Sequence, residues 1–333
     1  MGRMGKRFAW MAAAAMLAVA AAEGREYQVF DVVGDSISAG VNPECGIYGW
    51  VHMLFGQLAC GQEASTSTLT NLWPDAVAYN SSVSGSTAKD WAWAQPAYMQ
   101  AVSNHHPDLV VLFIGGNDGL AYAADGDYTE AEKEEFRTNL VAIVQQLRAN
   151  SPVPDVVVVN YYDLFDGLSS NLPPAYAAYR TLSAAVAAGN QMIEGVAASN
   201  GCFHVDVHSG FMHHAYGGEL GDAGHLSPDY VRTPLSAFDI HPSTAGHHAI
   251  RLAIYERLAE LKEIPKFLAP SGTAGQAVIR WSSGTGQSYV LQRATDSTNA
   301  YEGVATNAGT PPLNVLTDSV EAVDRAFYRI LVE

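Results

Sequence analysis

Three widely separated positions carry side chains that together suit nucleophilic attack on a carbonyl group. Ser36 follows an apolar run and a Gly-Asp turn, Asn117 follows a second apolar run and two glycines, and His241 stands directly before a proline. A serine hydroxyl is a poor nucleophile at neutral pH, so it needs a base within hydrogen-bond reach and donors for the oxyanion that forms. Imidazole titrates near neutrality without special tuning, which makes His241 the candidate base.

Donors for such an oxyanion are expected from three positions. Ser36 offers its backbone N–H, and Gly85 lacks a side chain, so its backbone N–H can approach a ligand closely. The side-chain amide of Asn117 is the third donor. Loss of one donor of this kind typically lowers turnover by about 10²–10³-fold. We therefore expect Ser36, Gly85 and Asn117 to form one oxyanion hole.

The segments around these residues alternate between strand-like and helix-like patterns, which predicts a parallel sheet with helices on both faces. Several candidate strands are almost wholly apolar, as in strands buried on both faces. Sites in such folds lie at the carboxyl ends of the strands, where the candidate residues also stand. The candidate strands are 27–33, 76–80, 108–114, 155–160 and 202–207, and the candidate helices are 48–59, 88–103, 129–150, 175–199 and 243–262.

Taken in order, Ser36, Gly85, Asn117 and His241 resemble the four sequence blocks of the SGNH hydrolases, the GDSL esterase/lipase superfamily. The resemblance covers roughly residues 27–262, and its specificity comes from the Gly-x-Asn-Asp and His-Pro blocks in combination. It implies a three-layer α/β/α, flavodoxin-like fold with a parallel five-stranded sheet. It also implies hydrolysis of an ester through an acyl-serine intermediate, without a metal or other cofactor.

The third catalytic residue departs from the family pattern, which usually has an aspartate three residues before the histidine. Phe238 occupies that position here, and the nearest acid is Asp239. Three arrangements are open. Asp239 reaches Nδ1 of His241 through an altered turn, the backbone carbonyl of Phe238 accepts that hydrogen bond, or a remote acid such as Asp229 fills the role. We favour Asp239.

Aromatic residues and a long polar segment are candidates for shaping access to Ser36. Trp91, Tyr161 and Tyr162 follow candidate strands and are candidate lining residues of a substrate pocket, although core packing is the commoner role for such side chains. Residues 209–237 form a long, Gly-rich, polar segment, and loops of that length are often lids.

Acidic and histidine residues elsewhere are given structural roles. Asp35 and Asp118 are expected to accept backbone N–H bonds in their turns. The other histidines do not predict a metal site, because no cysteine or carboxylate cluster accompanies them at ligand spacing. These histidines are His204, His208, His213, His214, His225, His247 and His248.

Composition narrows the partners and the compartment. The chain has 333 residues and a formal net charge of −16, which disfavours nucleic acid and anionic membrane surfaces as partners. Basic residues near the N-terminus precede an apolar run that ends in three alanines, which predicts a signal peptide over 1–22 with cleavage near Ala22. The protein would then be periplasmic or extracellular. The run is short against the roughly 20 residues of a membrane span.

The pattern changes beyond the last candidate helix. Prolines and a Ser-Gly pair predict a linker over 265–272, after a hydrolase-like domain over 23–264. Residues 273–333 contain short strand-like runs at 278–282, 289–294 and 327–332, which predict a small β-sandwich-like module that resembles fibronectin-like sandwiches. Cys45 and Cys60 are candidates for a disulfide, with buried thiols as the equal alternative.

These observations predict an exported serine esterase that acts on short acyl esters or acetylated carbohydrates. Its partner would be a small-molecule or polysaccharide ester. The same site would also serve a lysophospholipase, a lipase or a sugar O-acyltransferase. An alternative of another class is a non-catalytic carbohydrate-binding protein with a decayed site.

Overall fold

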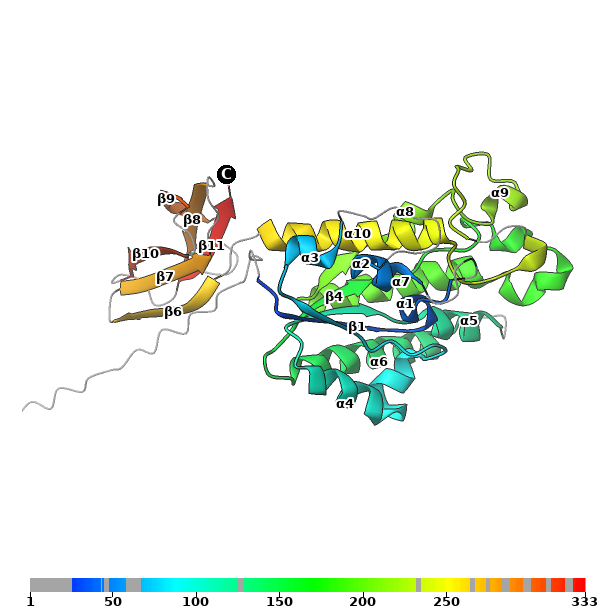
Figure 1. Cartoon of the computed structure of the whole chain (residues 1–333), viewed down its shortest axis with the longest axis horizontal. Helices are drawn as coiled ribbons and strands as arrows, with labels where there is room; N and C mark the ends of the chain where they lie inside the picture. The colour runs from blue at the N-terminus through cyan, green and yellow to red at the C-terminus, as the bar shows by residue number, and fades with distance from the viewer. Residues whose placement is uncertain are drawn as a thin grey trace, which may run out of the picture. The chain divides into compact units, whose positions relative to one another are not determined.

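A parallel sheet forms the centre of Tyr27–Leu258, the larger of the two units into which the chain divides, and Ala259–Glu333 belongs to the smaller unit (Figure 1). The computed structural model describes residues 26–42, 44, 48–57, 67–124, 128–231, 235–263, 267–273, 276–282, 288–295, 301–309, 313–320 and 326–332. The expected signal peptide, 1–22, and the candidate Cys45–Cys60 pair lie outside the described residues.

The sheet has five parallel strands in the order β2-β1-β3-β4-β5, which confirms the expected flavodoxin-like topology. In this order the chain reverses its direction of growth between β1 and β3, and such switch points are where open α/β sheets bind ligands. The strands are β1 (Val29–Gly34), β2 (Val77–Asn80), β3 (Leu109–Phe113), β4 (Asp155–Val159) and β5 (Phe203–Val205).

Central strands are apolar because helices cover both of their faces. Every residue of β3 is buried, as expected of a strand inside a parallel sheet. Asp31 in β1 is an exception to this apolar composition, because it is an acid and is fully buried. Its carboxylate accepts hydrogen bonds from Ser81 Oγ at 3.0 Å and His105 Nδ1 at 2.8 Å. These bonds offset part of the cost of removing a carboxylate from water.

Helices complete the outer layers of the sandwich. Figure 1 shows α4 (Pro96–His105) and α6 (Glu130–Arg148) on one face of the sheet, and α2 (Trp50–Leu54) and α10 (Thr244–Glu263) on the other. A further long helix, α7 (Leu182–Ser199), packs against α6, β4 and β5. The capping box of Thr129 and Glu132 fixes the start of α6.

The shorter helices lie mostly at the strand ends. The single helix expected over 88–103 is instead two segments, η1 (Asp90–Ala94) and α4. Pro96 begins α4, and a proline there cannot continue a preceding helix. Likewise, the first part of the predicted helix 175–199 is a separate 3₁₀ segment. The shorter helical segments are α1 (Ser36–Ala39), α3 (Leu69–Leu72), η1 (Asp90–Ala94), α5 (Gly116–Ala124), η2 (Ser169–Asn171), η3 (Pro174–Tyr179), α8 (Val207–Phe211), α9 (Gly217–Leu220) and η4 (Leu235–Ala237). Among the described residues, no helix combines the length and the apolar character that a bilayer span requires.

The C-terminal unit is an all-β module, as expected. Its strands pair antiparallel into two sheets, β10-β7-β6 and β11-β8-β9, and side chains of both sheets, including Trp281 and Tyr289, share one buried core. The strands are β6 (Phe267–Thr273), β7 (Gln276–Ser282), β8 (Ser288–Ala294), β9 (Glu302–Ala308), β10 (Leu313–Ser319) and β11 (Phe327–Val332).

Most of the expected linker, 265–272, is strand β6. The prolines suggested a linker because proline has no N–H to donate to a sheet. In the structure, Pro270 lies where the pairing register with β7 shifts, between Leu268 and Ser271, so the missing donor interrupts the ladder only locally. The expected domain limits, 23–264 and 273–333, otherwise stay a prediction.

Candidate active site

The structure brings Ser36, His241 and Asp239 into one chain of hydrogen bonds. His241 Nε2 lies 3.0 Å from Ser36 Oγ, and His241 Nδ1 lies 2.7 Å from Asp239 Oδ1. The same carboxylate oxygen accepts the backbone N–H of His241 at 2.9 Å. Because Nδ1–H donates to the carboxylate, the lone pair of Nε2 faces the serine hydroxyl, as a general base requires.

Of the three arrangements considered for Nδ1 of His241, the structure has the one with Asp239. His241 Nδ1 bonds to the Asp239 carboxylate in place of the Phe238 carbonyl, and the Asp229 carboxylate lies 2.7 Å from His225 Nε2. A two-residue spacing is sufficient because Asp239 turns its carboxylate back onto both the backbone and the ring of His241.

Ser36 is presented by the turn that follows β1. Asp35 caps the N-terminus of α1, and its Oδ1 accepts the backbone N–H of Ile37 at 3.0 Å, as expected of a residue in this turn. A Cβ at Gly34 would lie 2.7 Å or less from Ser38 and from the carbonyl oxygen of Phe113, so this position excludes any other residue. Ser36 itself is 7% exposed.

The side chain of Asp35 is held by a buried tyrosine, Tyr161. Tyr161 O–H donates to Asp35 Oδ2 at 2.5 Å and also approaches the Phe113 carbonyl oxygen at 3.3 Å. Burial raises the pKa of Asp35 to about 6, and the bond from Tyr161 opposes that shift. The aspartate that caps the nucleophile's helix is therefore tied to the sheet through Tyr161.

The expected oxyanion donors come from neighbouring loops. Asn117 Nδ2 donates to the backbone carbonyl of Ser86 at 2.9 Å, which ties the start of α5 to the loop that contains Gly85. Gly85 has a φ of +82°, a conformation that glycine adopts without strain. The backbone N–H groups of Ser36 and Gly85 have no acceptor within the described part of the chain.

Trp91, which we expected in a substrate pocket, lies in the core instead. It is 1% exposed, and its Nε1–H donates to Ser86 Oγ at 2.9 Å. Ser86 Oγ in turn donates to the carbonyl of Gly34 at 3.2 Å. The large apolar ring explains its burial, and its polar tip connects the Gly85 loop to the end of β1.

Asp118 connects its own turn to a neighbouring loop. Its carboxylate accepts the backbone N–H of Ala88, with the closer oxygen at 2.9 Å. Burial raises the pKa of Asp118 to about 6.

Two tyrosines hold the loop that carries His241. Tyr216 O–H donates to the carbonyl of Asp239 at 3.2 Å and accepts the Asp239 backbone N–H at 3.1 Å. Tyr162 O–H donates to the carbonyl of Ile240 at 2.8 Å. Tyr216 belongs to the segment expected to form a lid, and sequence reasoning missed it because no local pattern reveals contacts with a loop more than twenty residues away.

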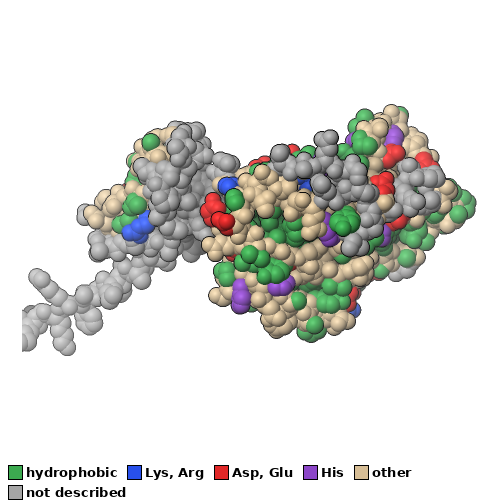
Figure 2. Space-filling model, viewed as in Figure 1, with side chains coloured by type: hydrophobic (Ala, Val, Ile, Leu, Met, Phe, Trp, Pro, Cys, Tyr) green, Lys and Arg blue, Asp and Glu red, His purple; other side chains and the backbone are tan. Residues whose placement is uncertain are grey.

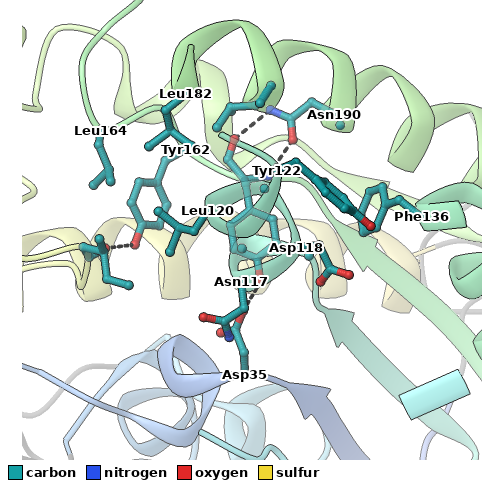
Figure 3. A pocket seen from close by; sticks show the side chains of 18 of the residues that line it. Asp35, Asn117, Asp118, Leu120, Tyr122, Phe136, Tyr162, Leu164, Leu182 and Asn190 are labelled. Carbon is teal, nitrogen blue, oxygen red and sulfur yellow. Dashed lines mark hydrogen bonds between the residues drawn. The ribbon is translucent and has the colours of Figure 1, made fainter. Parts of the chain in front are cut away.

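A cavity of about 60 Å³ opens beside Ser36. Figure 3 shows Asp35 and Asn117 at one end and Leu182 and Asn190 at the other. Tyr161 and Tyr162, the two other candidates for a substrate pocket, line this cavity, whereas no described residue of 209–237 does. Its apolar lining includes Ile37, Leu120, Phe136, Leu164, Leu182, Ala185, Val186, Ile193 and Ile240.

A separate cluster of acids and a histidine lies near α9, where acidic and histidine side chains gather on the surface (Figure 2). Asp166, Asp222 and His225 are close enough to share a metal ion. This proximity was not expected from sequence spacing. The Asp166 carboxylate already accepts three backbone N–H bonds, from His213, Ala215 and Gly217, so its lone pairs are largely occupied.

A sequence model of the GDSL-like Lipase/Acylhydrolase family matches residues 32–249, the region that holds all of these site residues. The chain belongs to this family, and it is a carboxylic ester hydrolase of the SGNH type. No curated protein shows significant similarity to the sequence.

Solved structures with a similar fold include three esterases or hydrolases. Axe2, an acetylxylan esterase from Geobacillus stearothermophilus, is 16% identical, covers 71% of this chain and 96% of its own, and has a TM-score of 0.45. The acetyl xylan esterase AlAXEase is 16% identical, with coverages of 68% and 98% and a TM-score of 0.49. LAE5, an α/β hydrolase from the metagenome of Lake Arreo, Spain, is 21% identical, with coverages of 72% and 97% and a TM-score of 0.45.

Proposed function

We propose that this protein is an exported serine esterase that hydrolyses short acyl esters, with acetylated carbohydrates among its substrates. The observation that carries this proposal is the continuous hydrogen-bond chain from Ser36 through His241 to Asp239. Membership of an acylhydrolase family supports the reaction class. Export rests on the basic and apolar pattern of residues 1–22.

In the acylation step, His241 Nε2 takes the hydroxyl proton as Ser36 Oγ attacks the carbonyl carbon of the ester. The imidazolium that forms is stabilised by the Asp239 carboxylate, which also fixes the ring orientation through Nδ1–H. His241 then gives its proton to the alcohol oxygen as the C–O bond breaks. The alcohol leaves, and the acyl group stays on Ser36.

In the deacylation step, water replaces the alcohol. The water oxygen attacks the acyl carbonyl carbon while His241 takes a proton from the water. His241 then gives that proton to Ser36 Oγ as the carboxylic acid leaves. In both steps the negative oxygen would accept hydrogen bonds from the N–H groups of Ser36 and Gly85. The second N–H of the Asn117 amide is the third donor, since only one is used by Ser86.

The substrate is expected to be an uncharged ester. The net charge of −16 repels anionic substrates and anionic lipid surfaces, which favours a carbohydrate or other neutral alcohol over a lipid surface. The small volume of the cavity beside Ser36 favours a short acyl group over a long fatty acyl chain.

Release of p-nitrophenol from its acetate and butanoate esters tests the proposal, with acetylated xylan assayed beside them. We expect Ser36→Ala to abolish turnover. Ser38→Ala is the matched control, because Ser38 is a buried serine two residues away whose hydroxyl has no partner in the described part of the chain. Equal turnover by Ser36→Ala and the native protein would contradict the proposal, and so would the absence of turnover on every ester, which would favour a non-catalytic binding protein.

A further inference from the structure

We propose that the cavity beside Ser36 is an acyl pocket whose depth is set by α7, and that it selects butanoyl to hexanoyl groups over both acetyl and long fatty acyl groups. This inference rests on the proposed acylation of Ser36. It adds the class of acyl group and the helix that determines it.

The pocket begins at the nucleophile. Ser36, Asn117 and Gly116 line its near end, so an acyl group bonded to Ser36 Oγ has a continuous path into it. The backbone at Gly116 packs closely against this end of the pocket, because a Cβ there would lie 2.6 Å from the Tyr161 ring and 3.2 Å from the Asp35 carboxylate.

The interior of the pocket suits a hydrocarbon chain. Its walls come from three helices, with Leu120 on α5, Phe136 on α6 and Leu182 on α7. A site lined mainly by such side chains favours apolar groups, because apolar walls do not replace the hydrogen bonds that a polar group loses on leaving water.

Five polar side chains at the pocket wall, those of Asp35, Tyr161, Tyr162, Asn190 and Asp118, already have hydrogen-bond partners within the protein. Asp35 accepts from Tyr161, and Tyr162 donates to Ile240. Asn190 uses both ends of its amide on the backbone of Tyr161, at 2.8 Å and 2.7 Å. Figure 3 shows these bonds as dashed lines. Asp118 accepts from Ala88. These groups therefore do not call for a polar ligand.

One face of α7 forms the deep end. Ala185, Gly189 and Ile193 recur every four residues and all line the pocket, as residues on one helical face do. A Cβ at Gly189 would meet no heavy atom within 4 Å, so the absence of a side chain there leaves open space. Adding a side chain at this position should shorten the pocket.

The volume sets the length of the acyl group. A cavity needs roughly 10–15 Å³ for each water molecule, and a methylene group is close to water in size, so about 60 Å³ holds a chain of a few carbons. Acetyl would leave most of the apolar wall without contact. Each methylene accommodated in a hydrophobic pocket changes selectivity by about tenfold or more.

The test measures kcat/KM on p-nitrophenyl acetate, butanoate, hexanoate and dodecanoate. We expect the native protein to prefer butanoate and hexanoate. In Gly189→Leu, the ratio of kcat/KM for hexanoate to that for acetate should fall at least tenfold. Gly195→Leu is the matched control: it replaces another glycine of α7 that has open space around it but lies outside the pocket, so this ratio should not change. Ile193→Ala, which enlarges the pocket, should raise the ratio of dodecanoate to hexanoate.

A native preference for acetate, or equal hexanoate-to-acetate ratios in Gly189→Leu and Gly195→Leu, would overturn the acyl pocket while leaving the esterase proposal standing. Failure of the proposed function looks different, because Ser36→Ala would then hydrolyse the esters as well as the native protein. An unchanged dodecanoate-to-hexanoate ratio in Ile193→Ala would argue against α7 as the end of the pocket.

Discussion

His241 Nε2 lies within hydrogen-bond reach of Ser36 Oγ, although 205 positions of sequence separate the two residues. Ser36 is fixed by the turn after β1, and His241 by a loop whose Pro242 pairs with Val231 in an isolated bridge. Both anchors involve buried backbone, so the contact between nucleophile and base is built into the fold of this unit. The predictions below test what each supporting residue contributes.

The carboxylate of Asp239 should orient His241. We expect Asp239→Asn to lower kcat by about 10²–10⁴-fold, because an amide in this position favours the wrong imidazole tautomer and cannot stabilise the imidazolium. Steady-state kinetics on p-nitrophenyl butanoate measure the effect. Asp229→Asn serves as the control, since its carboxylate faces His225, and it should leave kcat unchanged. An unchanged kcat in Asp239→Asn would indicate that a backbone carbonyl suffices.

The amide of Asn117 should act on the transition state rather than on substrate binding. Asn117→Ala is expected to reduce kcat by about 10²–10³-fold, as loss of one oxyanion donor does, with a much smaller change in KM. Separate determination of kcat and KM on one ester checks this expectation. A change confined to KM would instead place Asn117 among the groups that bind the ground state.

The bond from Tyr161 to Asp35 should contribute more to stability than that from Tyr162 to Ile240. Tyr161→Phe removes the donor to Oδ2 of the buried Asp35 carboxylate, and a hydrogen bond to a charged group typically contributes about 1.5–3 kcal/mol, whereas a neutral hydrogen bond contributes about 0.5–1.5 kcal/mol. Urea unfolding of Tyr161→Phe and Tyr162→Phe compares two buried tyrosines that differ mainly in the acceptor. Equal losses of unfolding free energy would show that the hydrogen bond to the Asp35 carboxylate contributes no more to stability than the bond to the neutral Ile240 carbonyl.

Buried His247 should make the protein sensitive to acid. Its Nδ1 accepts the Trp50 backbone N–H at 3.2 Å and its Nε2–H donates to the Val41 carbonyl at 3.0 Å, so the folded protein holds it neutral. Burial lowers its pKa from 6.5 to about 4. The unfolded chain therefore binds a proton between those values when the folded protein does not, and the stability due to His247 is lost as the pH falls from about 6.5 towards 4.

Comparison with His247→Gln isolates this effect from Asp35 and Asp118, whose pKa values are raised to about 6 and which act in the opposite direction. The unfolding free energy of His247→Gln minus that of the native protein should rise by up to about 3 kcal/mol as the pH falls from 7 to 4. Urea denaturation at each pH measures the difference. A difference that does not vary with pH would mean that folding leaves the pKa of His247 unchanged, which would contradict the prediction.

Sequence patterns predicted the strands of the sheet and the site residues that stand next to them in the chain. The apolar runs of β3 and β4 gave the parallel sheet, and Ser36, Asn117 and His241 were found because each stands next to the end of a strand or the start of a helix. The pattern did not reveal Tyr216 or the role of Trp91, because their bonds join segments that are distant in sequence or hidden in the core. Strand β6 was missed because a proline looks the same in a linker and at a bulge.

Covalent labelling tests most directly the claim that His241 activates Ser36. Diethyl p-nitrophenyl phosphate reacts with activated serine hydroxyls, and peptide mass spectrometry locates the diethylphosphoryl group. We predict that Ser36 alone is labelled in the native protein, and that His241→Ala, with its fold verified by circular dichroism, is labelled far more slowly. Labelling at another residue, or labelling of Ser36 at the same rate in His241→Ala, would contradict the account.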